Sequence, residues 1–272
     1  MPAGYARKRW CKDWGQISFG ERIMIITQHV TKYFGGFPAV QDVSFEIHQG
    51  EIVGFLGQNG AGKTTLMRIL TSYLPASSGV VLIDGEDMAG NSLSIRKKIG
   101  YLPETPPLYT NMTVKDYLKF AAEIKDVPVK QQRHRLDKVL EECQLVNVQG
   151  KAIGTLSKGY KQRVGIAQAI IHEPKILILD EPTSGLDPIQ ILQVRDLIKN
   201  LRNERTVLLS THILSEIEQI AQRVLIIRAG QIIVDDTLDA LLSVPGAAPD
   251  GRSTLEDVFV RCHQKSHEVS GE

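Results

Sequence analysis

The chain is poor in cysteine, has no excess of charge of either sign and contains no long apolar run. Cys11, Cys143 and Cys262 are odd in number and far apart, which argues against a disulfide framework or a zinc site and favours free thiols in a reducing compartment. Lysine and arginine number 32 against 31 aspartates and glutamates, a balance that gives no indication of a nucleic-acid partner. Because no run of about 18 apolar residues occurs, we predict no membrane-spanning helix.

Residues 1–23 differ in character from the rest of the chain. Their charges are mainly basic, with Arg7, Lys8, Arg9, Lys12 and Arg22 against Asp13 and Glu21. They lack helical or strand periodicity and the apolar core of a signal peptide. Two interpretations stay open: a disordered basic tail, or a misassigned start with Met24 as the native first residue. The second rests on Gly20-Glu21-Arg22, which a purine-rich ribosome-binding sequence can encode. We therefore predict an ordered domain over 24–235, followed by an accessory segment over 236–272.

A glycine-rich stretch, GQNGAGKT from Gly57 to Thr64, matches the phosphate-loop pattern G-x-x-x-x-G-K-[ST]. A predicted buried strand precedes it and a predicted helix follows it, so backbone N–H groups and the helix N-terminus would form an anion site. Lys63 can reach outer phosphates, and the Thr64 hydroxyl can bind Mg²⁺. A turn without a ligand is the alternative. The predicted phosphate-binding residues are Gly57, Gln58, Asn59, Gly60, Ala61, Gly62, Lys63, Thr64 and Thr65.

The periodicity predicts an α/β protein. The opening third reads as strands joined by tight turns, the middle third as helices, and the rest as alternating strands and helices. The predicted strands cover 23–30, 40–47, 51–56, 80–83, 175–180, 206–210, 224–227 and 231–234. The predicted helices lie within 113–121, 133–143, 164–170, 189–201, 213–222 and 254–263. Thr113 is placed to cap the first of these helices, with Asp116 at the capping-box position. The sequence thus predicts a P-loop NTPase core with a mainly parallel sheet, an N-terminal antiparallel β subdomain and a helical subdomain inserted over about 105–172.

Polar residues come directly after two of the apolar strands. Asp180 ends one strand and can hold Mg²⁺ through its water shell, while Glu181 can orient or deprotonate a water that attacks a γ-phosphate. His212 comes after the next core strand and can hydrogen-bond that phosphate. Each residue has a structural alternative when taken alone, but their places beside a phosphate loop favour the functional interpretation.

A second candidate anion site lies in LSKGYKQR, residues 156–163. Ser157 is placed as the N-cap of a helix, and its hydroxyl together with the Gly159 backbone can bind an anion. An ordinary capped helix is the alternative. One small domain rarely needs two such sites unless it meets two nucleotides, so this segment suggests a dimer.

With these motifs in order, the chain resembles the ATP-binding subunit of ABC transporters over about 24–235. The motifs are GQNGAGKTT at 57–65, IGYLPE at 99–104, LSKGYKQR at 156–163, ILILDEP at 176–182, SGLD at 184–187 and STH at 210–212. The resemblance implies ATP and Mg²⁺ as cofactors. It also implies a head-to-tail dimer in which each ATP lies between the phosphate loop of one subunit and Ser157 and Gly159 of the other.

The resemblance also assigns roles to single residues. Glu181 would be the general base, His212 would stabilise the γ-phosphate, and Asp187 would signal across the dimer. Phe34 would stack on adenine; the neighbouring Tyr33 is a second candidate, and core packing is the alternative. The metal ligands implied are Thr64, Glu104 and Asp180.

Two positions depart from the family pattern. Glu104 stands where glutamine is common, which adds charge beside the phosphates and puts metal affinity and coupling to the membrane partner in question. The signature reads Ser-Lys-Gly-Tyr in place of Ser-Gly-Gly-Gln, so Lys158 brings a compensating positive charge. This combination is similar to bacterial export-type ATPases, including those named for gliding motility and multidrug export.

Three functions are compatible with a phosphate loop in this setting. The first is the ATPase subunit of an exporter, peripheral on the cytoplasmic face of a bacterial membrane, which requires a separate integral permease and a second ATP-binding subunit. The second is a soluble ABC-type ATPase that acts on a ribosome, on DNA or on an assembly scaffold. The ribosome class usually carries two ATPase domains and the DNA class a long coiled coil, whereas this sequence shows one such domain and no sustained heptads. An assembly scaffold is therefore the remaining target of a soluble ATPase. The third, a phosphate-loop kinase, gives the 156–163 signature no role. The transported substrate is not predicted.

Overall fold

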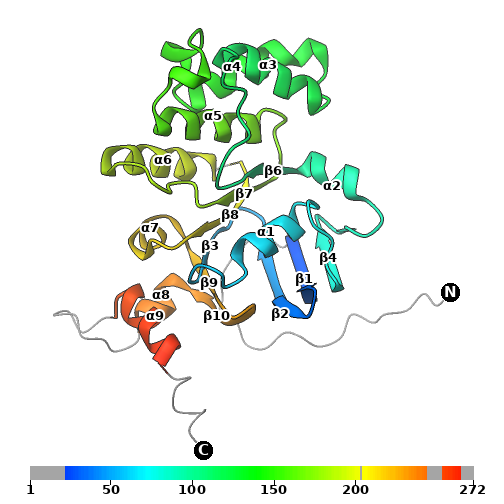
Figure 1. The fold of residues 1–272 in the computed structure, drawn as a ribbon, viewed down its shortest axis with the longest axis vertical. Coiled ribbons are helices and arrows are strands. Elements are labelled where there is room, and N and C mark those ends of the chain that lie inside the picture. Colours follow the sequence, from blue (N-terminus) through cyan, green and yellow to red (C-terminus); the bar gives the residue numbers. More distant parts are fainter. Residues whose placement is uncertain (1–21, 203, 244–252, 265–272) are drawn as a thin grey trace, which may run out of the picture.

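The computed structural model describes residues 22–202, 204–243 and 253–264. Most of the predicted tail, 1–23, therefore lies outside the described residues, and so does Cys11; Cys143 and Cys262 are free thiols. The described strands form two sheets, one antiparallel and one mainly parallel, with helices around them (Figure 1). No helix within the described residues combines the length and apolar character needed to cross a membrane.

The antiparallel sheet contains the longest strands and has the order β2-β1-β4-β5. Its strands are β1 (Ile23–Phe34), β2 (Phe37–His48), β4 (Ser78–Ile83) and β5 (Glu86–Asp87). β1 and β2 extend beyond the predicted ranges 23–30 and 40–47 because they continue as a hairpin in which Phe34 pairs with Phe37.

The second sheet has the order β10-β9-β3-β8-β7-β6, and only β10 runs antiparallel to its neighbour. Its strands are β3 (Ile52–Leu56), β6 (Ile99–Leu102), β7 (Ile176–Asp180), β8 (Thr206–Thr211), β9 (Arg223–Arg228) and β10 (Gln231–Thr237). Every residue of β3, β7 and β8 is buried, as expected of parallel strands covered on both faces. The predicted strands and the hairpin after 224 are confirmed.

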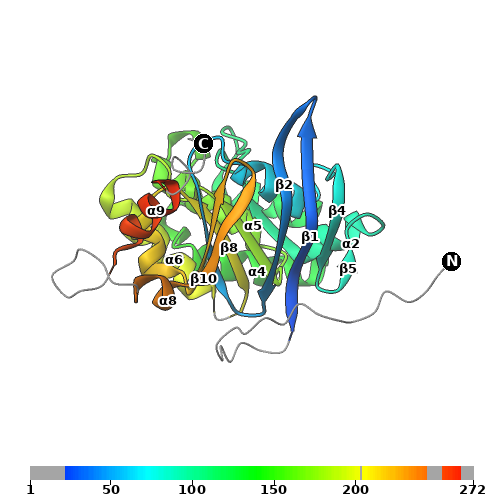
Figure 2. The same cartoon turned by 90° about the horizontal axis from the view of Figure 1, so that it is seen from below.

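The helices connect these strands and cover the parallel sheet. They are α1 (Lys63–Leu70), α2 (Ser92–Lys98), α3 (Val114–Ile124), α4 (Val129–Glu142), α5 (Lys158–Ile170), α6 (Pro188–Leu201), α7 (Leu214–Ile220), α8 (Leu238–Leu242) and α9 (Leu255–Gln264). Figure 2 shows the antiparallel sheet on one side of the parallel sheet and α8 and α9 on the other. Helices α3 to α5 fall inside the predicted insertion over 105–172, whose status as a separate subdomain stays a prediction.

Side chains alternate between two apolar cores, one on each face of the parallel sheet. In β3, Ile52 and Leu56 pack into the core that contains the residues of α3 to α7, whereas Val53 and Phe55 pack into the core shared with α1 and the antiparallel sheet. This period of two is the geometry of an extended strand. Because β3 lies between the two cores, the loop that follows Leu56 begins at the carboxyl end of this buried strand.

Local side-chain caps begin several helices. The Thr113 hydroxyl accepts a hydrogen bond from the Asp116 backbone N–H at 3.1 Å and donates to the Asp116 carboxylate at 2.6 Å, which confirms the predicted capping interaction. Ser157 caps α5 by accepting from the Tyr160 N–H at 3.4 Å. Asp187 caps α6 by accepting from the Gln190 N–H at 2.9 Å.

A single carboxylate, that of Asp84, joins the two sheets at one end. Its side chain is only 3% exposed and contacts three cations: Arg22 before β1, Lys98 at the end of α2 (3.2 Å) and Lys175 before β7 (3.0 Å). Burial raises the pKa of this carboxyl, but the hydrogen bonds from Lys175, Arg22 and Lys98 together bring it below its ordinary value. At the other end, the Gln41 N–H donates to the Gly230 carbonyl at 2.8 Å.

Candidate nucleotide site

The phosphate loop joins β3 to α1 and requires glycine at two positions. Gly62 has a φ of 109°, and a Cβ there would lie 2.4 Å from the Ala39 carbonyl oxygen of β2. A Cβ at Gly57 would lie 2.5 Å from the Ile227 carbonyl oxygen of β9. Both contacts are shorter than backbone atoms tolerate, so the loop fits against β2 and β9 only without side chains at these positions.

The first turn of α1 leaves its backbone donors without a side-chain cap. The helix begins at Lys63 directly after Gly62, and no side chain accepts a hydrogen bond from its first N–H groups. Such donors, together with the helix dipole, attract an anion. The structure thus confirms the strand, glycine turn and helix N-terminus predicted from the sequence.

Lys63 is buried beneath this loop. Its Nζ donates to the carbonyl oxygens of Gly57, at 2.7 Å, and Gln58, at 3.3 Å, and lies 3.7 Å from Glu181 Oε1. Only 6% of the side chain is exposed. The ammonium group is therefore held at the base of the loop, next to the acidic residues that end β7.

Asp180 has one satisfied and one unsatisfied carboxylate oxygen. The Ser210 hydroxyl donates to Oδ1 at 2.6 Å, whereas Oδ2 is buried without a hydrogen-bond partner. A fully buried carboxylate oxygen normally has a partner, so an orphaned one fits a cation. Burial, with the Asp180 charge as the next cause, raises the pKa of Tyr101 to about 12. The donor set suits Mg²⁺, because carboxylate and hydroxyl oxygens are hard ligands.

Glu181 is held between the side chains of His212 and Lys63. Its Oε2 accepts a hydrogen bond of 2.7 Å from His212 Nδ1, while its Oε1 faces Lys63. The backbone of Glu181 has a φ of 49°, which is uncommon for a residue with a side chain, and its N–H donates to the backbone oxygen and hydroxyl of Ser210, both at 3.1 Å. The strained backbone turns this carboxylate toward the phosphate loop at the end of β7.

Glu216 of α7 supports both chain segments that carry these residues, and sequence reasoning missed it. Its buried Oε2 accepts hydrogen bonds from Thr183, at 2.6 Å, and from Thr211, at 3.3 Å. Burial raises the pKa of this carboxyl. No short motif includes Glu216, so its role becomes visible only from the packing of α7 against β8.

Ser210 belongs to the STH motif, but the motif alone did not identify it as the partner of Asp180.

Two other residues predicted to belong to the nucleotide site, Phe34 and Glu104, are exposed. Phe34 ends β1 and is 52% exposed, with Lys32 Nζ 5.6 Å from the centre of its ring, so core packing does not explain this aromatic. Glu104 is exposed two residues after β6. Because β6 and β7 pair in parallel, Glu104 and Asp180 lie at strand ends that share one edge of the sheet.

The second predicted anion segment is not part of the phosphate loop of the same chain. Ser157, Gly159 and Asp187 begin α5 and α6, which lie beyond β6 and β7 from α1 in Figure 1. A Cβ at Gly159 would lie 2.7 Å from the Gln190 side chain, so glycine also serves the close packing of α5 on α6. One chain therefore brings together the loop, Asp180, Glu181 and His212, but not Ser157, Gly159 and Asp187.

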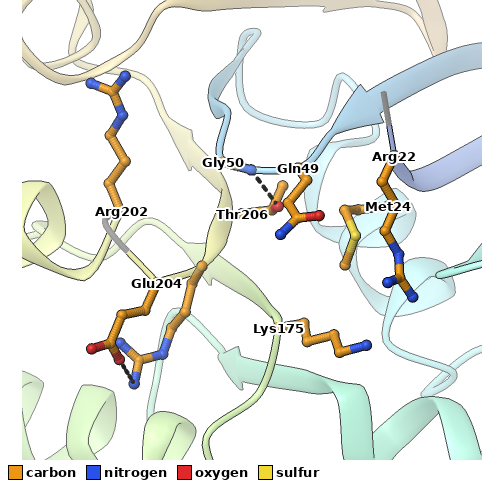
Figure 3. Close-up of a pocket in the computed structure, with 9 residues that line it drawn as sticks. Arg22, Met24, Gln49, Gly50, Lys175, Arg202, Glu204 and Thr206 are labelled. Atoms are coloured by element: carbon orange, nitrogen blue, oxygen red, sulfur yellow. Dashed lines mark hydrogen bonds and ion pairs between the residues drawn. The ribbon is translucent and has the colours of Figure 1, made fainter. Parts of the chain in front are cut away.

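Some pockets lined by the described residues lie outside this site. One, of about 170 Å³, opens at the edge of the sheet opposite the phosphate loop, where the Gly50 N–H donates to Thr206 Oγ1 at 3.0 Å (Figure 3). Arg22 and Lys175 reach it from one side and Arg202 and Glu204 from the other. Another is an apolar groove beside α3.

Comparison with known proteins identifies the family. A family profile described as ABC transporter matches residues 40–184, which is more than half of the chain. This chain belongs to the ABC transporter family. The bacitracin transport ATP-binding protein BcrA of Bacillus licheniformis is 42% identical over 80% of this chain and 71% of its own length. The lantibiotic transport ATP-binding protein SrtF of Streptococcus pyogenes is 35% identical over 87% of this chain and 96% of its own length.

Solved structures agree with this assignment. The ATP-binding subunit of an ABC transporter matches with a TM-score of 0.78 at 28% identity, covering 89% of this chain and all of the other. A dimeric ATP-binding cassette in a post-hydrolysis state, bound to ADP and Pi, matches with a TM-score of 0.72 at 26% identity, covering 79% of this chain and 99% of the other. The fold of this ABC protein is thus that of a P-loop ATPase, it binds ATP, and its activity is ATP hydrolysis.

Proposed function

We propose that this ABC ATPase hydrolyses ATP between two copies of itself and thereby drives export through a separate integral membrane permease. The observation that carries the proposal is the divided site. The phosphate loop, Asp180, Glu181 and His212 converge in one chain, whereas α5, which begins at the predicted anion-binding residues Ser157 and Gly159, lies apart from the phosphate loop in Figure 1. Head-to-tail pairing would place Ser157 and Gly159 of one copy against the ATP of the other.

The chemistry assigned to each residue depends on its position. Glu181 would accept a proton from the attacking water as the water oxygen bonds to the γ-phosphorus and the bond from that phosphorus to the bridging oxygen of ADP breaks. Lys63 would leave the loop carbonyls for the phosphates. His212, whose Nδ1 is held by Glu181, would present Nε2 to the γ-phosphate. Phe34 would stack on adenine, and Asp187 would report occupancy across the dimer.

A divalent cation is part of the proposal. Thr64, Asp180 and Glu104 would hold Mg²⁺, and the orphaned Asp180 Oδ2 supports this assignment. When bound, the ion would neutralise charge on the phosphates. A carboxylate at position 104, in place of an amide, would strengthen the contact with the ion and add negative charge beside the substrate.

The relatives support the transport role. BcrA and SrtF are named as ATP-binding proteins of bacitracin and lantibiotic transport, and both come from bacteria. We infer that this chain likewise serves an integral permease and lies peripherally on the cytoplasmic face of a bacterial membrane.

Mixing two inactive variants tests the divided site. Ser157→Arg blocks the segment that reaches into the other copy, and Lys63→Ala removes the phosphate-loop cation. In a 1:1 mixture, half of the dimers are hybrids with one intact site, so ATP hydrolysis should recover to about a quarter of the wild-type rate. A mixture of Ser157→Arg with the double variant Lys63→Ala/Ser157→Arg is the control and should stay inactive. Absence of recovery in the first mixture would contradict a shared site.

Purification from detergent-solubilised membranes tests the permease. The tagged wild-type chain should bring down a polytopic membrane protein that raises its rate of ATP hydrolysis. Recovery of the chain only from the soluble fraction, bound to a scaffold protein, would contradict the transport function.

A further inference from the structure

A basic pocket lies at the amino ends of the parallel strands, on the edge of the sheet opposite the phosphate loop. We call it the amino-end pocket; its volume is about 170 Å³. Its place follows from the strands, because Gly50 precedes β3, Lys175 precedes β7 and Thr206 begins β8. Nucleotides bind open α/β sheets at the carboxyl ends of the strands, so this pocket is separate from the nucleotide site.

The charges that line the amino-end pocket do not balance. The lining includes four cations and one acid, namely Arg22, Lys175, Arg202, Arg205 and Glu204. Figure 3 shows Arg22 and Lys175 on one side of the pocket and Arg202 and Glu204 on the other. A concave surface that carries charge of one sign concentrates ions of the opposite sign. The lining therefore favours an anionic ligand.

The carboxylates beside the first pair of cations do not neutralise them. Arg22 and Lys175 both contact Asp84, which also contacts Lys98 at 3.2 Å. Lys98 has a second partner, Glu86, at 2.7 Å, so two negative charges face three positive charges. The side chains of Arg22 and Lys175 are 57% and 54% exposed, and each group has more N–H donors than its contact with Asp84 uses. Both can therefore donate to a ligand as well.

Arg205 brings a buried guanidinium without a hydrogen bond to the other side of the pocket. Only 4% of this side chain is exposed, yet the nearest carboxylate oxygens, of Glu204 and Glu142, lie 3.6 and 4.0 Å from its Nη2. Both distances are too long for a hydrogen bond, and within the described ranges the guanidinium has no other acceptor. Buried donors normally have partners, so this one indicates a missing acceptor.

Arg202 is a second cation on that side with donors to spare. It is exposed, and its side chain makes no hydrogen bond or ion pair with any residue that the structure describes. Glu204, the acid of the lining, is shared between Arg205 at 3.6 Å and Lys138 at 3.2 Å. An incoming anion would therefore meet donors from both sides of the pocket.

We propose that the amino-end pocket binds a dianionic phosphate group, either of free phosphate or of a phosphate monoester. Guanidinium groups donate paired hydrogen bonds to phosphate oxygens, and the lining places three of them beside one ammonium group. A single carboxylate carries one charge and two oxygens, so it would leave more of these donors without an acceptor. The proposal needs neither the permease nor a second copy of the chain.

A phosphate in this pocket would join three parts of the molecule. Arg22 leads directly into β1 of the antiparallel sheet, Lys175 leads into β7, and Arg202 is the C-cap of α6. The first residue of that helix follows Asp187, which is predicted to signal across the dimer. The ligand would thus stabilise the contact between the antiparallel sheet and the helix that carries this predicted signal.

Calorimetric titration with inorganic phosphate tests the proposal. The full chain would carry Lys63→Ala to weaken binding at the phosphate loop, with chloride at equal ionic strength as the reference. We expect saturable binding that Arg202→Gln weakens about tenfold or more, because a charge-assisted hydrogen bond is lost. Arg133→Gln, at an exposed position of α4 outside the lining, removes the same charge and should change the affinity less than about twofold.

Two further measurements assign the source of the phosphate and exclude an artefact. Sedimentation with phosphatidylcholine vesicles that requires both phosphatidic acid and Arg202 would assign the site to a lipid phosphate, whereas binding of inorganic phosphate without it assigns a soluble one. Arg202→Gln leaves the Asp84 cluster intact, so its melting temperature in chloride should stay within about 2 °C of the parent. Lost binding at an unchanged melting temperature then excludes unfolding.

The opposite results would overturn the proposal. Binding of neither phosphate source, or an affinity that Arg202→Gln lowers no more than Arg133→Gln does, would show that the amino-end pocket is not a phosphate site. Succinate, a dianion of two carboxylates, is the remaining control. If succinate binds as tightly as phosphate, charge alone explains the binding and the choice of phosphate is wrong.

Discussion

Replacing Lys125 by methionine should make the isolated chain more stable at neutral pH, although the change removes a hydrogen bond. Methionine has a similar length and fills irregular apolar space, so it can take the place of the lysine stem in the apolar groove beside α3. The bond that is lost, to His172 Nδ1, is long at 3.4 Å. The gain comes from removing an ammonium group that folding desolvates, while no carboxylate among the described residues lies within 4.0 Å of its Nζ.

The magnitude can be worked out from the pKa of Lys125. A change from 10.5 to about 8 corresponds to about 3 kcal/mol of destabilisation while the group is protonated in both states. Lys125 keeps some solvent contact and caps α3, so we take roughly half of this figure, about 1–2 kcal/mol, as the expected gain for Lys125→Met.

The sign of the pH dependence is fixed by the lowered pKa. Below about pH 8 the folded and the unfolded chain both carry the Lys125 proton, and the destabilisation has its full value. Between about pH 8 and 10.5 the folded chain has released this proton, whereas the unfolded chain still holds it. The wild-type chain therefore gains stability from this group as pH rises through that window. The advantage of Lys125→Met should fall by about half or more between pH 7 and pH 9.5.

Urea unfolding of both proteins at these two pH values measures the effect. Lys119→Met, at an exposed position of the same helix, should change the free energy of unfolding by less than about 0.5 kcal/mol. A Lys125→Met variant that is no more stable than wild type at pH 7, or whose gain does not depend on pH, would refute the view that this ammonium lacks a partner in the free protein.

Three further changes probe the nucleotide site. Glu181→Gln should lower the rate of ATP hydrolysis by about 10²–10⁴-fold, leave ATP binding intact and trap an ATP-bound dimer in size-exclusion chromatography; normal turnover would exclude Glu181 as the base. Gly62→Ala should weaken nucleotide binding about tenfold or more in calorimetry, because its Cβ meets a backbone oxygen, whereas Gly60→Ala, which shares a positive φ but has open space around it, should weaken binding less. Glu216→Ala should lower the free energy of urea unfolding by about 2–4 kcal/mol, because two buried threonine hydroxyls lose their acceptor, and Glu216→Gln by less than about 1 kcal/mol; equal losses would contradict the hydrogen-bonding role.

Features that depend on neighbours in sequence could be predicted. The phosphate-loop spacing, the capping of α3 by Thr113 and the capping of α5 by Ser157 all involve residues within a few positions of each other, and the structure confirms them. The buried parallel strands were equally predictable because strands covered on both faces are wholly apolar. These observations, together with the order of the motifs, were sufficient to predict the fold and the family from the sequence.

Features that depend on tertiary packing could not be predicted. The Glu181–His212 contact joins residues 31 positions apart, and the fit of Gly62 against Ala39 depends on β2. α7 spans Leu214–Ile220 and not the predicted 213–222. Thr211 Oγ1 accepts from the Ile213 N–H before the helix begins, and after it Ala221 is extended and the Gln222 N–H donates to the Ile52 carbonyl at 3.0 Å. β5 and α2, between 84 and 98, are short, and no periodic pattern indicated them.

The Asp84 cluster makes one junction between the sheets sensitive to acid, whereas the main-chain hydrogen bond from Gln41 at the other end involves no group that titrates. Because the pKa of Asp84 is lowered, its contribution is complete above its ordinary pKa and is lost as pH falls through the lowered value. Strong acid would then weaken this attachment, while the Gln41 bond, the hydrogen bond from Arg223 to the Glu46 carbonyl of β2 and the shared apolar core would remain. Phe34 belongs to the antiparallel sheet and Lys63 follows a strand of the other sheet, so the weakened junction would loosen the alignment of the two groups predicted to hold the opposite ends of a nucleotide.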